Sequence, residues 1–282
     1  MTHRPEDKLV NPGIQPIGLD EVIDFHESTK GTVESDYLFA ENVYQYLFEY
    51  RGKMETSANR KNYFAFRRIE LPQVALPDVP YSEVIAKRVS QRDFTGAALS
   101  LERLSQLLAP FRSTRETVVD EDFDIRLNLR PYASPGGLYP CELYVALLTV
   151  EDQPPTICHY NPREHALTPI SKIDPKTFWA ALGERGNAGL AGSGACFLIS
   201  SMFERTVAKY GPLGYRFAMI ESGIMAHHLT LSAAACDLGS LVWGGYFDEE
   251  ANALFDADGF SETIVNCVFV GHSSNPTVPF DG

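Results

Sequence analysis

The 282-residue sequence predicts an α+β fold, or an α/β fold with a mostly antiparallel sheet. Three observations lead to this prediction. Helical and strand-like patterns are mixed along the whole chain, without internal repeats or low-complexity tracts. The short apolar runs 156–160 and 166–170 flank a turn-like segment, 161–164, and together indicate a hairpin. One long apolar run, 217–236, indicates a helix that is buried in the core.

The composition and charge exclude several classes of protein. The chain carries 24 basic and 37 acidic residues, a formal net charge of −13. Nucleic acids and anionic membrane surfaces attract basic proteins, so neither is an expected partner. The polar N-terminus has no apolar region of a signal peptide. The run 217–238 is interrupted by Glu221, His227, His228 and Asp237, which favours a core helix over a membrane span.

The five cysteines are spread widely and include no CxxC pair. Their odd number and wide spacing argue against both a disulfide framework and a zinc site. We expect reduced core residues and a cytoplasmic protein. The cysteines are Cys141, Cys158, Cys196, Cys236 and Cys267.

Residues 1–80 are predicted to form an irregular N-terminal lead-in to a domain at 81–282. Two short helices are expected in it, at 20–27 and 41–50. In the second, Tyr44, Leu47 and Phe48 fall at helical spacing and predict an apolar stripe. The segment 71–80 contains three prolines, so it should be an extended connector.

Within 81–282 the expected elements follow from spacing and caps. Leucines at 101, 104, 107 and 108 share one face of a helix at 99–108, and the acidic stretch 120–124 indicates a loop. Asp174 followed by Pro175 predicts a helix start, with the helix at 176–182. Asp248 can cap a helix that reaches Phe255. Buried strands are expected at 142–150, 196–200 and 264–270.

The stretch 209–247 places polar residues before the long helix and a glycine-rich turn after it. The pair Lys209-Tyr210 at its start is a candidate acid–base pair. A lysine or tyrosine acting as a base needs a shifted pKa, which burial or a cationic neighbour such as Arg216 can cause. An exposed pair before a helix is the simpler alternative.

Two other groups of residues are candidate ligand contacts. Arg88, Ser90 and Arg92 alternate, so an extended segment would point all three to one side, where they would suit a phosphate or a polyol. A surface basic patch is the alternative. Two glycine-rich clusters would let the backbone approach a flat ligand, although each could be a plain turn. They comprise Ser134, Pro135, Gly136 and Gly137, and Gly239, Ser240, Gly244 and Gly245.

Two further motifs receive weaker interpretations. The glycine-rich segment 189–194 precedes a strand, whereas a dinucleotide fingerprint follows one, so we expect an ordinary loop. His227 and His228 diverge by about 100° on a helix and cannot chelate one ion side by side. No metal site is predicted, but one or both histidines could line a pocket.

Several of these motifs form an ordered set along the chain. They are Phe25-His26-Glu27-Ser28-Thr29-Lys30, Arg88-x-Ser90-x-Arg92-x-Phe94, Ser134-Pro135-Gly136-Gly137-Leu138-Tyr139-Pro140-x-Glu142-Leu143-Tyr144, Lys209-Tyr210-Gly211, Gly214-Tyr215-Arg216, Glu221-x-Gly223, Leu238-Gly239-Ser240, Gly244-Gly245-Tyr246-Phe247-Asp248 and Val270-Gly271. This set resembles the nitroreductase superfamily of FMN proteins, over roughly residues 80–272. The Lys-Tyr pair makes the set similar to the SagB-type dehydrogenase branch, the azoline oxidases of peptide pathways.

The resemblance implies a nitroreductase-like FMN fold: a central, mostly antiparallel sheet flanked by helices, in a domain-interlocked homodimer with FMN at the interface. It assigns the FMN phosphate and ribityl chain to Arg88, Ser90 and Arg92. It assigns the flavin ring to the 134–137 loop of the partner chain and to the 239–245 turn. Lys209 and Tyr210 match the catalytic pair. Arg216, Glu221, His227 and His228 are candidate substrate-pocket residues.

The activity that the resemblance implies is FMN-dependent oxidation of a thiazoline or oxazoline in a peptide to the thiazole or oxazole. The peptide could be ribosomal or bound to a carrier protein, delivered with a pathway cyclase or synthetase. An NAD(P)H-dependent nitro or quinone reductase and a non-catalytic dimeric scaffold remain alternatives. The chain departs from the family at Ile224, where a histidine is common, and at His227-His228, which leaves the contacts of this helix open.

Overall fold

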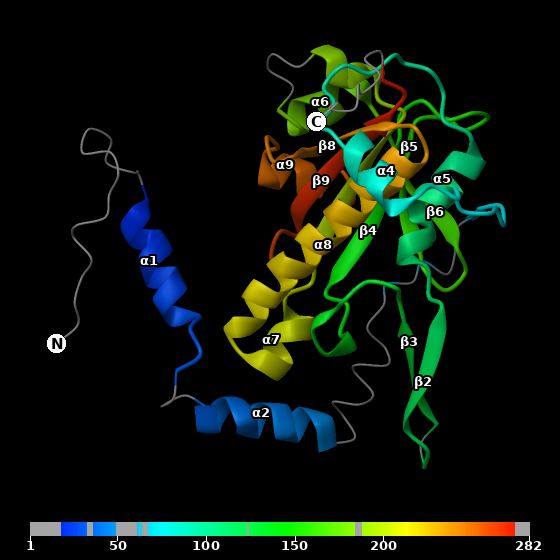
Figure 1. Ribbon diagram of the computed structural model, residues 1–282. Helices are drawn as coiled ribbons and strands as arrows, with labels where there is room; N and C mark the ends of the chain where they lie inside the picture. Colours follow the sequence, from blue (N-terminus) through cyan, green and yellow to red (C-terminus); the bar gives the residue numbers. More distant parts are fainter. Residues whose placement is uncertain are drawn as a thin grey trace.

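The computed structural model describes residues 18–32, 36–48, 61, 63, 67–122, 124–183 and 188–273. Within these residues the main sheet has seven strands: β1 (Ile69–Glu70), β4 (Cys141–Leu147), β5 (Thr156–Asn161), β6 (Ala166–Lys172), β7 (Ala195–Ser201), β8 (Gly239–Trp243) and β9 (Thr263–Gly271). Their order is β1-β6-β5-β4-β7-β9-β8 (Figure 1), and every neighbouring pair is antiparallel. The predicted class and the hairpin of β5 with β6 are confirmed.

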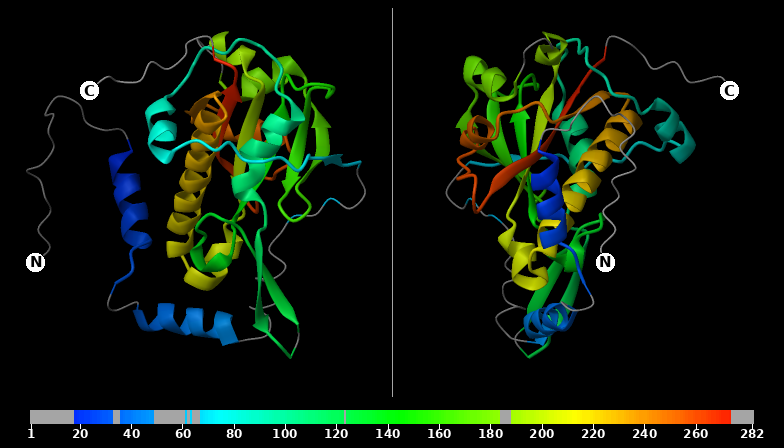
Figure 2. Two further views of the ribbon diagram at one scale, coloured as in Figure 1. Left: turned by 45° about the vertical axis from the view of Figure 1, so that its right-hand side comes forward. Right: turned by 90° about the vertical axis from the view of Figure 1, so that its left-hand side faces the viewer.

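The sheet is buried on both faces, as the alternation along β4 shows. Leu143 and Val145 belong to one hydrophobic core, and Tyr144 and Ala146 belong to the other. The first core is closed by α5 (Leu101–Leu108) and α8 (Leu213–Ala235), and the second by α6 (Pro175–Ala181) and α9 (Asp248–Ala253). The result is a sheet between two helical layers (Figure 2).

The long helix α8 contains 23 residues and crosses the face of the sheet (Figure 1). Ala218, Ala226 and Ala233 are buried on it, and these small side chains let the helix approach the strands closely. Among the described residues, no helix has the length and apolar character needed to cross a membrane. The predicted core helix is therefore confirmed. All five cysteines are buried and unpaired, as expected.

The two expected cap signals behave differently. Asp174 accepts a hydrogen bond from the Thr177 backbone N–H at 2.9 Å, so α6 begins as predicted. Asp248 was predicted to cap α9, but Phe247 is the N-cap and no side chain caps the helix. Asp248 instead lies in the first turn, where negative charge favours the helix dipole. The helix also ends at Ala253, short of Phe255.

Two predicted loops take part in strands. The start of the acidic stretch 120–124 belongs to β2 (Arg115–Asp120), which pairs with β3 (Ile125–Leu129) in a hairpin that extends away from the main sheet (Figure 1). The start of the predicted glycine-rich turn is the edge strand β8, paired with β9. Glycine in a sequence makes a strand harder to predict. Here the backbone pairing with the buried strand β9 holds Gly239 and Ser240 in a strand. A helix that the sequence did not predict, α4 (Tyr81–Lys87), follows the proline-rich connector.

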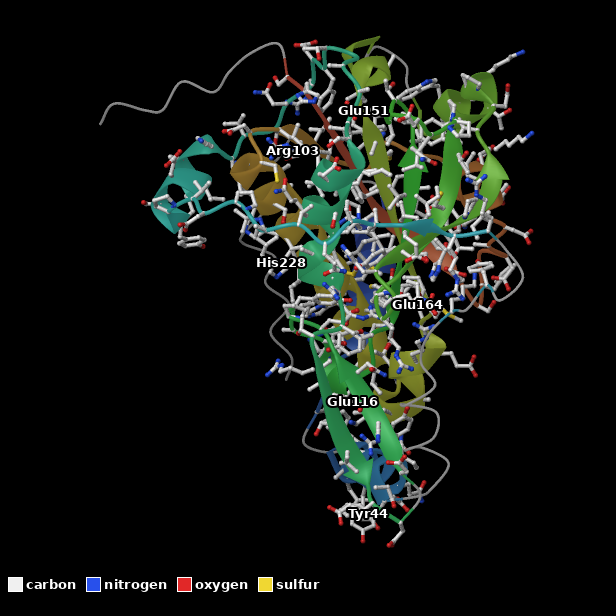
Figure 3. The ribbon with its side chains drawn as sticks, turned by 90° about the vertical axis from the view of Figure 1, so that its right-hand side faces the viewer. Tyr44, Arg103, Glu116, Glu151, Glu164 and His228 are labelled. Atoms are coloured by element: carbon white, nitrogen blue, oxygen red, sulfur yellow. The ribbon has the colours of Figure 1, made fainter. Side chains whose placement is uncertain are left out.

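The lead-in contains the two helices expected there, α1 (Leu19–Ser28) and α2 (Asp36–Phe48). Residues 49 and 50, included in the predicted second helix, lie outside the described residues. The predicted apolar stripe is the wrong face of α2: Tyr44 and Phe48 are 63% and 65% exposed, and Tyr44 lies at the lower tip of the molecule (Figure 3). Phe39, Val43 and Tyr46 are the half-buried residues. Both faces of α2 are apolar, so contact with α7 (Glu204–Tyr210) decides which one is covered.

Candidate active site

The loop 134–137 and the pair Lys209-Tyr210 meet at the lower end of α8. Pro135–Gly137 form one 3-10 turn, and Lys209 and Tyr210 end α7. Gly136 has φ 61°, and a Cβ atom there would lie 2.4 Å from Tyr210 Oη and 2.8 Å from Lys209 Nζ. A larger residue would displace the ends of both side chains, so glycine at this position lets the backbone approach both polar atoms.

Lys209 is a buried lysine, with only 6% of its side chain exposed. Its Nζ lies 5.2 Å from the centre of the Tyr210 ring and 5.6 Å from that of Tyr46. No carboxylate in the described part of the chain forms an ion pair with it. Burial lowers the pKa of the Lys209 amine and raises the pKa of the Tyr210 phenol. The lowered pKa makes it easier for Lys209 to lose its proton, and the raised pKa makes it harder for Tyr210 to do so.

A buried ionic network fixes α7 against the sheet. Arg205, in the first turn of α7, donates to the Tyr139 carbonyl at 2.8 Å and pairs with Glu142 at 2.7 Å. His159 lies 2.9 Å from the same carboxylate. Burial alone would raise the pKa of Glu142, but the charge of Arg205 and the His159 contact outweigh it and hold the pKa well below its usual range. The network therefore ties α7, which carries Lys209, to the segment that follows the 134–137 loop, which carries Gly136.

Glu221 lies beneath the same loop and is fully buried. One of its oxygens accepts the Cys141 N–H at 3.4 Å, and its Oε2 has no hydrogen-bond partner among the described residues. Burial raises the pKa of Glu221 to about 7, although the nearby Ser134 hydroxyl and the charge of Arg130 oppose this shift. In this structure Glu221 supports the loop from below, and its role as a pocket residue stays a prediction.

Arg216 holds the lead-in rather than the acid–base pair. Its guanidinium donates to the Thr29 hydroxyl at 2.8 Å and to the His26 carbonyl, both at the end of α1. Phe25 packs edge-on against Tyr215 at 4.9 Å. The motif at 25–30 and the motif at 214–216 are therefore in contact. Of the two causes considered for a shifted pKa of Lys209, burial and a cationic neighbour such as Arg216, burial is the one that acts here.

The second candidate group lies at the other end of α8. The chain leaves α4 in extended conformation at Arg88, and Ser90 bridges Ser240 at the start of β8. The Gln91 N–H donates to the Ser240 carbonyl at 2.9 Å. A Cβ on Gly239 would lie 3.0 Å from Gln91 Cβ, so the two predicted phosphate and turn segments are packed together.

The two arginines of this group are available to an anion. Arg88 is half-buried and Arg92 exposed, and neither guanidinium makes an ion pair or a hydrogen bond with the rest of the described chain. The neighbouring Lys87 is bound to Glu83 and Asp237, at 2.7 and 2.8 Å. In a chain of charge −13, two unpaired guanidinium groups on one short segment fit a phosphate ligand.

The two groups are separated by the length of α8. A helix of 23 residues is about 33 Å long, because each residue adds about 1.5 Å. The contact of Asp237 with Lys87 places Arg88 at the C-terminal end, and Gly136 and Lys209 lie at the N-terminal end. One chain therefore does not bring its Arg88 group and its Lys209 group together.

The remaining candidates make other contacts. A Cβ at Gly183 would lie 1.9 Å from the Gly245 carbonyl, so the 244–245 turn packs on the end of α6. A Cβ at Gly244 would meet open space. His227 is exposed, whereas His228 is half-buried near Phe111 and Tyr132 (Figure 3).

Two expected absences can be compared with the structure. The loop 189–194 packs through its glycines, because a Cβ at Gly189 or Gly192 would lie within 2.4 Å of the backbone carbonyls of Arg92 and Phe94. This explains the glycines without a nucleotide. Across the described ranges, no group of three or more His, Cys, Asp or Glu residues is placed to hold a metal ion.

Sequence reasoning missed three residues of this site: Phe39, Tyr46 and Arg205. Phe39 and Tyr46 are seven positions apart, with Val43 between them, a helical spacing that was visible beside the one chosen. The contact of Arg205 with the Tyr139 carbonyl left no sequence signal, because a backbone carbonyl is present at every residue.

Comparison with known proteins identifies the class of protein. The nitroreductase family model matches residues 85–272. The nitroreductase MJ1384 of Methanocaldococcus jannaschii is 27% identical over 189 residues, covering 66% of this chain and 88% of that protein. A nitroreductase structure from Ralstonia eutropha superposes with a TM-score of 0.60 at 21% identity, covering 76% of this chain and 93% of the other. The chain belongs to the nitroreductase family and is an oxidoreductase of that fold.

Two further comparisons involve the microcin B17 system of Escherichia coli. The microcin B17-processing protein McbC is 30% identical over 133 residues, which span 46% of this chain and 49% of McbC. The microcin synthetase McbBCD complex with truncated pro-MccB17 bound contains a chain that matches with a TM-score of 0.58 at 22% identity. That match covers 93% of this chain and 95% of the other. At 22% identity, the second match concerns the fold.

Proposed function

We propose that the protein is an FMN-dependent azoline oxidase, which converts a thiazoline or oxazoline in a peptide to the thiazole or oxazole. The observation that carries this proposal is the buried Lys209 amine, without a carboxylate partner in the described chain, beside Tyr210 and the Gly136 backbone. A nitro or quinone reductase needs no such base. Aromatising an azoline does, because one ring carbon must lose a proton as another loses a hydride.

The residues of the chain have separable tasks in this reaction. Lys209 Nζ accepts the ring proton, and the burial that lowers its pKa favours the unprotonated amine that this step needs. Tyr210 keeps its proton and can donate a hydrogen bond to the substrate. The cofactor is FMN, as in the family to which the chain belongs, and when bound it supplies the hydride acceptor. The opposite directions of the two pKa shifts support Lys209 rather than Tyr210 as the base.

The unpaired arginine group supports the proposed place of FMN. Arg88, Ser90 and Arg92 would hold its phosphate and ribityl hydroxyls, beside the backbone at Gly239 and Ser240. An extended FMN is shorter than α8, so its ring cannot reach Lys209 of the same chain from that phosphate site. We therefore propose a homodimer in which a second copy supplies Lys209, Tyr210 and the 134–137 loop to each FMN.

The microcin comparisons support the proposed substrate and partners. McbC is named for processing microcin B17, and the McbBCD structure holds a truncated precursor peptide. For this chain we propose a peptide substrate carrying an azoline, delivered by a synthetase or a carrier protein of its pathway.

Substitution of the pair tests this function. Lys209→Ala and Tyr210→Phe are expected to keep FMN bound and to reduce oxidation of a synthetic thiazoline peptide by at least about 100-fold, the typical contribution of a general base. Loss of two hydrogens from the peptide, followed by mass spectrometry, is the measurement. Lys176→Ala, an exposed lysine on α6, is the control. Unchanged turnover in both variants would overturn the role of the pair.

A further inference from the structure

The helix α2 covers the candidate acid–base pair, although it lies outside the part of the chain that matches the family model. Figure 1 shows it lying across the lower end of the molecule, beside α7. Its Tyr46 ring centre is 5.6 Å from Lys209 Nζ. Its Phe39 ring stacks on Tyr210 with the ring centres 6.1 Å apart. Two turns of one helix therefore each contact one member of the pair.

The covered face of α2 packs against α7. Phe39, Val43 and Tyr46 are half-buried, whereas Tyr37, Tyr44 and Phe48 are exposed. A helix of 13 residues is marginal in water by itself. Packing on α7 therefore helps to stabilise it, and this packing includes the aromatic contacts with the pair.

The contacts are chemically suited to the two side chains. An aromatic face excludes water from a lysine amine and still tolerates the ammonium form through a cation–π interaction. Lys209 has one such ring on each of two elements, Tyr46 from α2 and Tyr210 from α7. Tyr210 is in turn held between Phe39 and Phe217, whose ring centre is 5.0 Å away.

We propose that Tyr46 and Phe39 are positioning residues of the active site, with Tyr46 enclosing the Lys209 amine and Phe39 orienting the Tyr210 ring. The inference rests on the proposed function, since it treats Lys209 and Tyr210 as the reacting groups. It makes α2, which precedes the part of the chain matched by the family model, a part of the active site.

Chemical labelling of Lys209 tests this role without FMN or substrate. An amine-reactive reagent is applied over a range of pH, and the labelled peptide is quantified by mass spectrometry. Removing the ring in Tyr46→Ala should raise the apparent pKa of Lys209 towards its ordinary value and raise the limiting rate at high pH several-fold. Tyr46→Phe should behave like the original protein, because the ring is retained.

Tyr44→Ala is the matched control, since Tyr44 lies on the same helix and is exposed. Tyr46→Leu serves as a second variant that preserves apolar volume, and circular dichroism checks that each variant is folded. The inference would be overturned if Lys209 had the same apparent pKa and the same limiting labelling rate in Tyr46→Ala and Tyr46→Leu as in Tyr44→Ala. Normal turnover in Lys209→Ala would instead overturn the proposed function and leave the Tyr46 contact standing.

Discussion

Lys209, Tyr210 and Glu221 are ionisable side chains that the fold has removed from water. Burial lowers the pKa of Lys209 and raises those of Tyr210 and Glu221, so all three favour their neutral forms. The opposite pKa shifts of Lys209 and Tyr210 favour the lysine as proton acceptor and the tyrosine as proton donor. For Glu221 it provides a neutral carboxyl under the 134–137 loop near neutral pH.

Glu221→Gln is expected to stabilise the protein above pH 7. The folded state keeps the Glu221 proton up to about pH 7, whereas the unfolded state releases it near 4.5. The folded state thus binds more protons between these values, and its stability falls as pH rises through that window. Each pKa unit corresponds to about 1.4 kcal/mol, so the variant should gain roughly 1–3 kcal/mol above pH 7 and little below pH 4.

Urea denaturation at several pH values measures this difference. Glu151→Gln is the control, because Glu151 is exposed on the surface (Figure 3). If Glu221→Gln raised the free energy of unfolding by the same amount at pH 4 and at pH 8, the titration of Glu221 would not be the cause of the stabilisation.

At the scale of elements, the sequence predicted the helices that are set by their own residues, through caps and apolar spacing. The cap at Asp174, the leucine stripe of α5 and the apolar run of α8 correspond to real helices. The choice between the two apolar faces of α2 was not predictable, because α7, distant in sequence, makes it. The same holds for Gly239, which was predicted to lie in a turn but belongs to β8 because the strand pairs with β9.

In the candidate site, too, local motifs were predictable and the contacts between distant segments were not. The motifs named the two candidate groups, and the structure brings Gly136 to Lys209 and Ser240 to Ser90 as packed pairs. Their separation along α8 was not visible in the sequence, because it depends on how the ends of one helix meet other elements.

Gly136→Ala tests whether the loop and the pair act as one unit. The new Cβ would overlap Tyr210 Oη, and φ 61° would be strained for alanine. We expect the loop to shift away from the pair and turnover to fall by at least about tenfold, as catalysis depends on close positioning. Gly96→Ala is the control, since Gly96 has φ 78° but open space at its Cβ. Equal turnover in the two variants would contradict the importance of the contact.

At the scale of the whole molecule, the account requires two chains for one site. The arginine group and the acid–base pair lie at opposite ends of α8, which one FMN cannot span. The homodimer remains a prediction, and it makes a specific claim: each site combines the arginines of one chain with the lysine of the other.

Hybrid dimers distinguish this arrangement from sites within one chain. One chain would carry Arg88→Ala with Arg92→Ala, the other would carry Lys209→Ala, and two affinity tags would isolate the hybrid. If sites combine two chains, one site of the hybrid has both defects and the other is intact, so turnover should be about half that of the original dimer. Both parent dimers should be inactive. An inactive hybrid, with the original dimer active under the same tags, would place each site within one chain.

The central claim, that this oxidoreductase removes hydride from an azoline, is tested most directly by the visible absorption of the FMN-loaded protein under anaerobic conditions. A thiazoline peptide and NADPH are added in separate experiments. The account predicts that the peptide bleaches the flavin absorption and that NADPH changes it little. Immediate bleaching by NADPH with no response to the peptide would contradict the account and identify a reductase. Protein that takes up no FMN would contradict both and favour a scaffold.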